Sequence, residues 1–143
     1  MPNSPSKRQV KKVPQKYKDF VKDCAQKAAW SIGVSHYRID IHYMDEAKDS
    51  DGETNTRGEM ETDKRYLQGT MRLYPKVLAQ WEKGEINQVK EVVYHEIAHL
   101  ATQHFYDVAT SIYKDEGETK DAWETCTEVI GRLALKIDEL ENK

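Results

Sequence analysis

Residues 85 to 105 predict a helix with two different faces, and this feature restricts the possible folds more than any other. With about 100° between successive residues, His95 and His99 point the same way, one turn apart. The opposite side of the helix carries an apolar stripe, formed by Ile86, Val89, Val93, Ile97 and Leu100. Such a helix fits between two layers of structure, with the stripe facing one layer and the histidines facing the other.

The flanking segments predict helices and strands in one short series. Apolar residues at helical spacing indicate helices, and the strict alternation in HYRIDIHYM indicates a half-buried strand. The order of elements predicts an α+β fold with a small sheet. The expected helices span residues 15–33 and 75–83 and start again near Thr119 after a polar connection, and the expected strands span residues 36–44, 58–63 and 66–74.

The chain of 143 residues is long enough for one domain, which we expect over residues 15–143. Residues 1–14 hold three prolines and few apolar side chains, so we interpret them as a disordered basic leader. The lysines and arginine between residues 7 and 18 are interpreted as a solvated surface. With a net charge of −3, the chain gives no general reason to expect nucleic acid or an anionic membrane as partner.

The location that we expect is cytoplasmic. The N-terminus lacks the apolar run of a signal peptide, and no stretch approaches the ~18 apolar residues of a membrane span. Cys24 and Cys126 lie too far apart in sequence for a metal knuckle and do not form a disulfide framework. Both fall at apolar positions of predicted helices, so we expect them to be buried.

The stretch HEIAH, residues 95–99, has the composition and spacing of a zinc site. Two neutral imidazoles one helical turn apart can bind one ion, and a catalytic zinc takes three protein ligands and keeps one water. Glu96 lies about 100° round the helix from His95, where it can reach that water as a general base. The alternative is an ordinary helix that carries two histidines. The apolar stripe and a suitable downstream ligand favour the zinc interpretation.

The third ligand must come from elsewhere in the chain. His104 falls about 180° from His95 on a continuous helix, so we expect it at the edge of the core. Glu124 and Glu128 lie one turn apart on the final helix, on the same side as Gly131. A solvated face is the alternative, but Gly131 would let a second helix come close, so we expect this face to pack against the histidine helix. The other, broader apolar stripe of the final helix consists of Trp123, Cys126, Val129, Ile130, Leu133 and Ile137.

On these residues the sequence resembles the zincin metallopeptidases, specifically the gluzincin group and its minimal single-domain relatives in bacteria and phages. HEIAH matches the active-site helix of that family, and ETCTEVIG, residues 124–131, is similar to its glutamate helix. The resemblance implies a zincin-like fold and one zinc ion per chain, held by His95, His99 and Glu124, with Glu96 as the base. It also implies that Glu128 orients a ligand histidine, and Glu128 remains the alternative ligand.

The function that we expect from this resemblance is a zinc-dependent peptidase acting on a peptide or protein substrate. Residues 66–74 could supply the exposed edge strand that takes up an extended peptide in zincins. Tyr106 and Tyr113 are candidates for stabilising the oxyanion, with aromatic packing as the alternative for both. The alternative function is a catalytically silent zincin-like module that binds a metal or a partner. The sequence leaves the substrate and the oligomeric state open.

Overall fold

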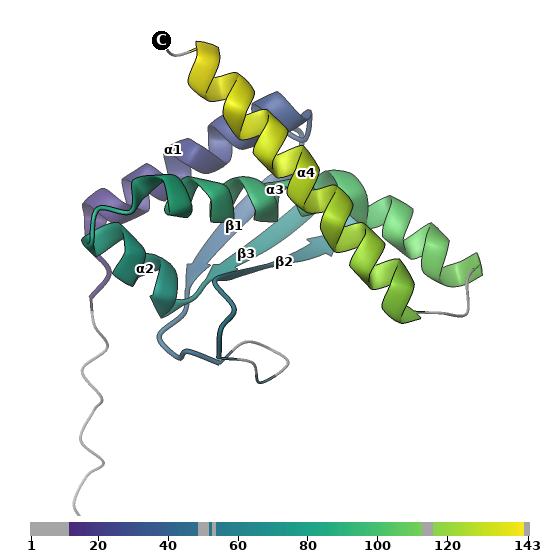
Figure 1. Ribbon diagram of the computed structural model, residues 1–143, viewed down its shortest axis with the longest axis horizontal. Coiled ribbons are helices and arrows are strands. Elements are labelled where there is room, and N and C mark those ends of the chain that lie inside the picture. Colours follow the sequence, from purple (N-terminus) through teal and green to yellow (C-terminus); the bar gives the residue numbers. More distant parts are fainter. Residues whose placement is uncertain (1–11, 49–51, 53, 113–115, 142–143) are drawn as a thin grey trace, which may run out of the picture.

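The computed structural model describes residues 12–48, 52, 54–112 and 116–141 of the chain. These residues form an α+β fold, as predicted, with helices at both ends of the sequence and the strands between them (Figure 1). Only residues 12–14 of the predicted leader belong to the described part, so its disorder remains a prediction. The elements are α1 (Gln15–Ile32), β1 (Arg38–Tyr43), β2 (Gly58–Asp63), the short 3-10 helix η1 (Lys64–Tyr66), β3 (Gln68–Leu73), α2 (Pro75–Glu82), α3 (Ile86–Ile112) and α4 (Glu116–Glu141).

The three strands form one mixed sheet in the order β1-β3-β2. β3 pairs in parallel with β1 and antiparallel with β2, and its side chains alternate between a buried and a half-buried face. The prediction that residues 66–74 form the exposed edge strand is therefore wrong, because β3 has a partner on both sides. The edge strand that packs beside α3 is β2.

α3 lies between the sheet and α4 (Figure 1). This agrees with the prediction that the helix with the histidines fits between two layers of structure. Its apolar stripe contributes Val89, Val93 and Ile97, all fully buried, to a core shared with α1 and the sheet. The other side of α3 packs against α4. α1 ends at Gly33, as predicted, and contacts both α3 and the last turns of α4. Among the helices of the described residues, none has the length and apolarity that crossing a membrane would need.

The connection between the last two helices is much shorter than the predicted polar segment. α3 continues to Ile112 and α4 begins at Glu116. The described residues of the predicted connection, 106–112 and 116–118, lie on these two helices. The helices contact each other, since Tyr106 on α3 stacks on Trp123 of α4 at 4.2 Å between ring centroids. His104 is exposed and not at the edge of the core, because the end of α3 extends beyond the sheet and α1.

The face of α4 that carries Glu124 and Glu128 packs against α3, which confirms the sequence prediction. Gly131 makes this close approach possible: a Cβ atom at this position would lie 3.1 Å from the backbone N and Cα of His95. Cys24 is buried, as expected, but Cys126 is exposed. The expectation failed at Cys126 because this part of the broader apolar stripe of α4 faces outward, with Val129, Leu133 and Ile137 all exposed.

Candidate metal centre

The two histidines come from the middle of α3, on the side that faces α4. His99 is buried and His95 is half-buried. Their rings lie 4.8 Å apart between centroids and are nearly perpendicular, with an interplanar angle of 83°. The helical spacing of four residues therefore brings both imidazoles to one place, as the sequence predicted.

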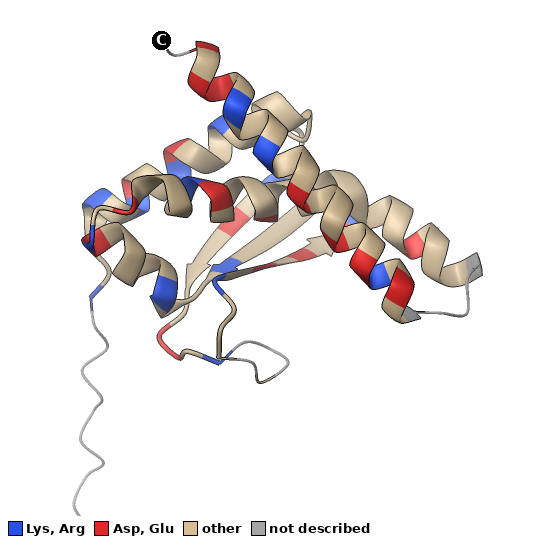
Figure 2. Cartoon of the chain, in the orientation of Figure 1, with Lys and Arg blue, Asp and Glu red and all other residues tan. Residues whose placement is uncertain are grey.

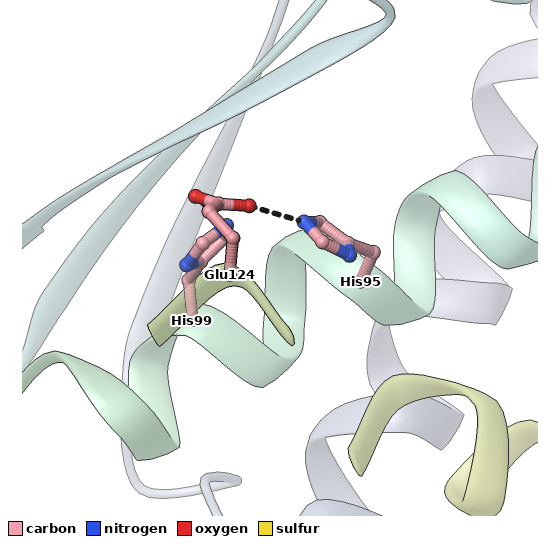
Figure 3. Close-up of side chains that lie close together, drawn as sticks. All are labelled: His95, His99 and Glu124. Atoms are coloured by element: carbon pink, nitrogen blue, oxygen red, sulfur yellow. Dashed lines mark ion pairs between the residues drawn. The ribbon is translucent and has the colours of Figure 1, made fainter. Parts of the chain in front are cut away.

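Glu124 faces both histidines from the first half of α4 (Figure 3). One of its carboxylate oxygens lies 3.3 Å from Nε2 of His95, and the other lies 3.6 Å from Nε2 of His99. With zinc–ligand bonds of about 2.0–2.2 Å, the ligand atoms of a tetrahedral site lie about 3.3–3.6 Å apart. The ligand atoms of the three residues all lie within 4.8 Å of one another, so the group can hold one metal ion.

Glu128 occupies a different position, on the other nitrogen of His95. Its Oε2 lies 2.5 Å from Nδ1 of His95, and its Oε1 accepts a hydrogen bond of 2.5 Å from Nε of Arg132. A carboxylate on Nδ1 fixes the ring orientation and leaves Nε2 available to a metal. Of the two glutamates that the sequence offered as ligand, the geometry thus brings Glu124 to the side of the two Nε2 atoms.

Glu96 is buried under the edge of the sheet, with 4% of its surface exposed. One of its oxygens lies 3.6 Å from Nε2 of His99. Gly58 at the start of β2 leaves the space for this side chain, since a Cβ atom there would lie 3.0 Å from Cγ of Glu96. Burial raises the pKa of Glu96 to about 8, and the charge of Glu124 adds to this effect.

The carboxylates affect the two histidines in opposite ways. Burial lowers the pKa of His95, but the hydrogen bonds to Glu124 and Glu128 and the charge of Glu96 outweigh it and raise the pKa to about 9. Burial is the main effect on His99 and lowers its pKa to about 4. With no cation present, the centre therefore keeps its proton on His95. A metal ion that binds both rings would release this proton.

Trp123 supports the centre, and the sequence analysis did not identify this role. Its ring packs against His99 at 4.6 Å between centroids, and its Nε1 donates a hydrogen bond of 2.8 Å to Oγ1 of Thr102. Thr102 also shares a hydrogen bond of 2.8 Å with buried Thr127 on α4. A signal was present in the sequence, since Thr102 lies on the same side of α3 as the histidines, about 20° from His95 on the wheel.

The centre opens into a cleft of about 750 Å³ between the edge of the sheet and α4. α3 forms its floor, and residues of β2 and α4 line its two sides. Six glutamates and two arginines are among the lining residues, so the cleft is acidic. Of the two tyrosines considered for the oxyanion, Tyr106 stacks on Trp123 and is not among the lining residues, and Tyr113 lies outside the described residues.

Comparison of the chain with protein-family models, curated proteins and solved structures found no match. The geometry of the centre is therefore the basis for inferring its function.

Proposed function

We propose that the protein is a zinc-dependent peptidase with a zincin-like fold and a cytoplasmic location. The observation that carries this proposal is the convergence of three potential ligands beside a buried carboxyl group. Nε2 of His95 and Nε2 of His99 both face Glu124, and Glu96 lies next to them on the same helix. The location is supported by the two unpaired cysteines, which are typical of a reducing compartment.

The donor set fits zinc better than the harder divalent cations. Two imidazole nitrogens and one carboxylate oxygen are the ligands of a catalytic zinc site that keeps a fourth position open, whereas calcium and magnesium prefer oxygen ligands. When bound, one zinc ion per chain would polarise a peptide carbonyl and acidify a water molecule. His95, His99 and Glu124 would hold it.

The other residues of the centre would handle the proton and keep the ligands in place. Glu96 would take the proton of the attacking water on its carboxylate and pass it to the leaving amine. Glu128 holds the ring of His95 through Nδ1, and Trp123 restricts the ring of His99 by packing against it. The ligands are thus oriented before substrate arrives, which lowers the cost of reorganisation during the reaction.

The edge strand β2 is suited to bind the substrate. It lines the cleft beside Glu96, and its outer edge has no neighbouring strand among the described residues. An extended peptide can add to such an edge through its backbone, with side chains directed into the cleft. Because the lining is acidic, we expect peptides with lysine or arginine next to the cleaved bond to react faster than matched peptides with glutamate.

The test is hydrolysis of a peptide library by the zinc-loaded protein and its Glu96→Gln variant. Glutamine has the same shape but cannot accept the proton, so we expect zinc to stay bound and the rate to fall by about 10²–10⁴-fold. Glu139→Gln, an exposed change at the end of α4, is the control and should keep full activity. Hydrolysis at close to the wild-type rate in Glu96→Gln would exclude Glu96 as the base. Zinc binding without hydrolysis in any variant would support the silent metal-binding module instead.

A further inference from the structure

The outward face of α4 carries an apolar stripe that no other element of the described chain covers. Nine large apolar side chains are strongly exposed among the described residues, and four of them lie on this helix. Exposed Ala122 and Cys126 continue the line toward the start of α4. Val129, Leu133, Ile137 and Leu140 are 50%, 55%, 53% and 67% exposed. The six residues together are called the α4 stripe below.

The arrangement of these residues is what distinguishes the stripe from scattered surface hydrophobes. On a helical wheel with about 100° per residue, all six lie within about 40° of one line. From Ala122 to Leu140 the stripe runs for roughly 27 Å at 1.5 Å per residue. A continuous apolar surface of this kind marks an interaction site on a soluble protein, whereas single exposed apolar residues do not.

We propose that the stripe binds the α4 helix of a second copy of this chain, in antiparallel orientation. The spacing of the stripe is complementary to itself when the twofold axis passes midway between Val129 and Ile130. Val129 then lies opposite Ile130 of the other copy, Cys126 opposite Leu133, and Ala122 opposite Ile137. Five of the six stripe residues thus meet an apolar residue, with half-buried Ile130 contributing from beside the stripe, while Leu140 lies at the level of Thr119.

The charges of α4 favour the antiparallel orientation (Figure 2). Its first half, residues 116–128, carries five acidic residues and one lysine, whereas residues 129–141 carry three acidic residues together with Arg132 and Lys136. A parallel pair would place the two more acidic halves side by side. An antiparallel pair brings exposed Asp121 to within about 3 Å, along the axis, of the level of the partner's Lys136.

This interface would leave the candidate metal centre accessible. Glu124 and Glu128 lie on the side of α4 that faces α3, whereas the stripe faces away from it. Zinc content and association are therefore independent measurements. The association proposal also stands if the protein has no peptidase activity.

The first experiment measures mass by sedimentation of the full chain over roughly 1–200 µM, where a moderate dimer would dissociate on dilution. We expect dimer at the higher concentrations. Leu133→Asp places a charge in the centre of the interface and should weaken dimerisation by at least about tenfold. Trp30→Asp is the matched control, since Trp30 is 79% exposed on α1 and lies off the stripe, so it should dimerise as the wild type does. Circular dichroism and zinc content verify that both variants fold.

The second experiment tests the orientation by disulfide formation in a Cys126→Ser background. Val129→Cys should cross-link two chains under mild oxidation, because the two copies of residue 129 lie almost level. Leu133→Cys should not, because its two copies would be about 10 Å apart along the axis and disulfides need Cα atoms within about 7 Å. A monomeric wild type at the highest concentration, a Leu133→Asp variant that still dimerises, or equal cross-linking at both positions would overturn the proposal.

Discussion

The carboxyl group of Glu96 lies in an environment very different from water, since only 4% of the residue is exposed. α3 holds its carboxyl group beneath β2, and this burial raises its pKa to about 8. In the metal-free protein the group therefore stays protonated at neutral pH. A dication next to Glu96 would lower its pKa and favour the carboxylate. Glu96 would therefore be ionised, and able to act as a base, once the metal is bound.

The raised pKa of Glu96 predicts a pH dependence of stability in the metal-free protein. The folded state binds the Glu96 proton up to about pH 8, whereas the unfolded state releases it near pH 4.5. The stabilisation from this group is complete below pH 4.5 and is lost as the pH rises to 8. Between pH 6.5 and pH 8 it should fall by about 2 kcal/mol.

The measurement is urea unfolding in excess chelator at the two pH values. Compared with wild type, Glu96→Gln should lose less free energy of unfolding between pH 6.5 and pH 8, because glutamine does not titrate. The raised pKa of His95 acts in the same direction, so the free energy of unfolding still falls with pH to some extent in both proteins. Glu91→Gln, an exposed change on the same helix, should keep the wild-type slope. Equal slopes for wild type and Glu96→Gln would contradict the protonated, buried state of Glu96.

The sequence identified His95, Glu96 and His99 as one group because their spacing within a single helix determines their relative directions. It left Glu124 and Glu128 as alternatives, because two residues one turn apart on the same face of α4 are equivalent until the position of α4 along α3 is known. In the structure this position is set where Gly131 of α4 packs against the backbone of His95. The role of Trp123 depends on the same contact between helices, so the position of Thr102 on the histidine side of α3 indicated a polar partner there but did not identify Trp123.

At the scale of elements, the packing of α4 against α3 decides whether the centre exists. Gly131→Ala would place a methyl group 3.1 Å from the backbone of His95, which cannot yield as a flexible side chain can. We expect α4 to move outward, with a loss of about 1–3 kcal/mol in the free energy of unfolding. Zinc affinity should fall as well, since Glu124 and Glu128 move with the helix.

The matched control for this change is Gly117→Ala in the first turn of α4, which is exposed. Alanine is the better helix former, so this variant should be unchanged or more stable by up to about 1 kcal/mol. Thermal unfolding and a competitive zinc titration of both variants are the measurements. Unchanged zinc affinity in Gly131→Ala would mean that the close approach of the helices does not position the ligands.

Element types were predictable because helical and alternating spacings are local. The positions of the elements were not. α4 has apolar residues on two sides, and the sequence alone did not show that the broader stripe, with Val129 and Leu133, would face outward. Likewise, the sequence predicts β2 and β3 equally as short strands. Only the pairing of β3 with β1 in the structure shows that β2 lies at the edge of the sheet.

At the scale of the whole molecule, the centre lies where three layers meet. The sheet covers one side of α3 and buries Glu96, while α4 covers the other side and brings Glu124 and Glu128 to the histidines. The two-faced pattern of α3 predicted this layered arrangement. It could not show that the cleft would be bordered by β2, because that depends on the order of strands across the sheet.

If two helices jointly hold one zinc ion through His95, His99 and Glu124, the metal content of the protein must depend on all three residues. The measurement is zinc per chain, by elemental mass spectrometry after dialysis against a weak chelator. We predict about one zinc for wild type and much less for Glu124→Gln. Glu128→Gln should still load zinc, with affinity weakened by about 10–100-fold, since Glu128 faces Nδ1 of His95 and not the two Nε2 atoms that would bind the ion. A wild type without zinc, even when zinc is supplied in excess, or a loss confined to Glu128→Gln, would show that His95, His99 and Glu124 do not form the zinc site.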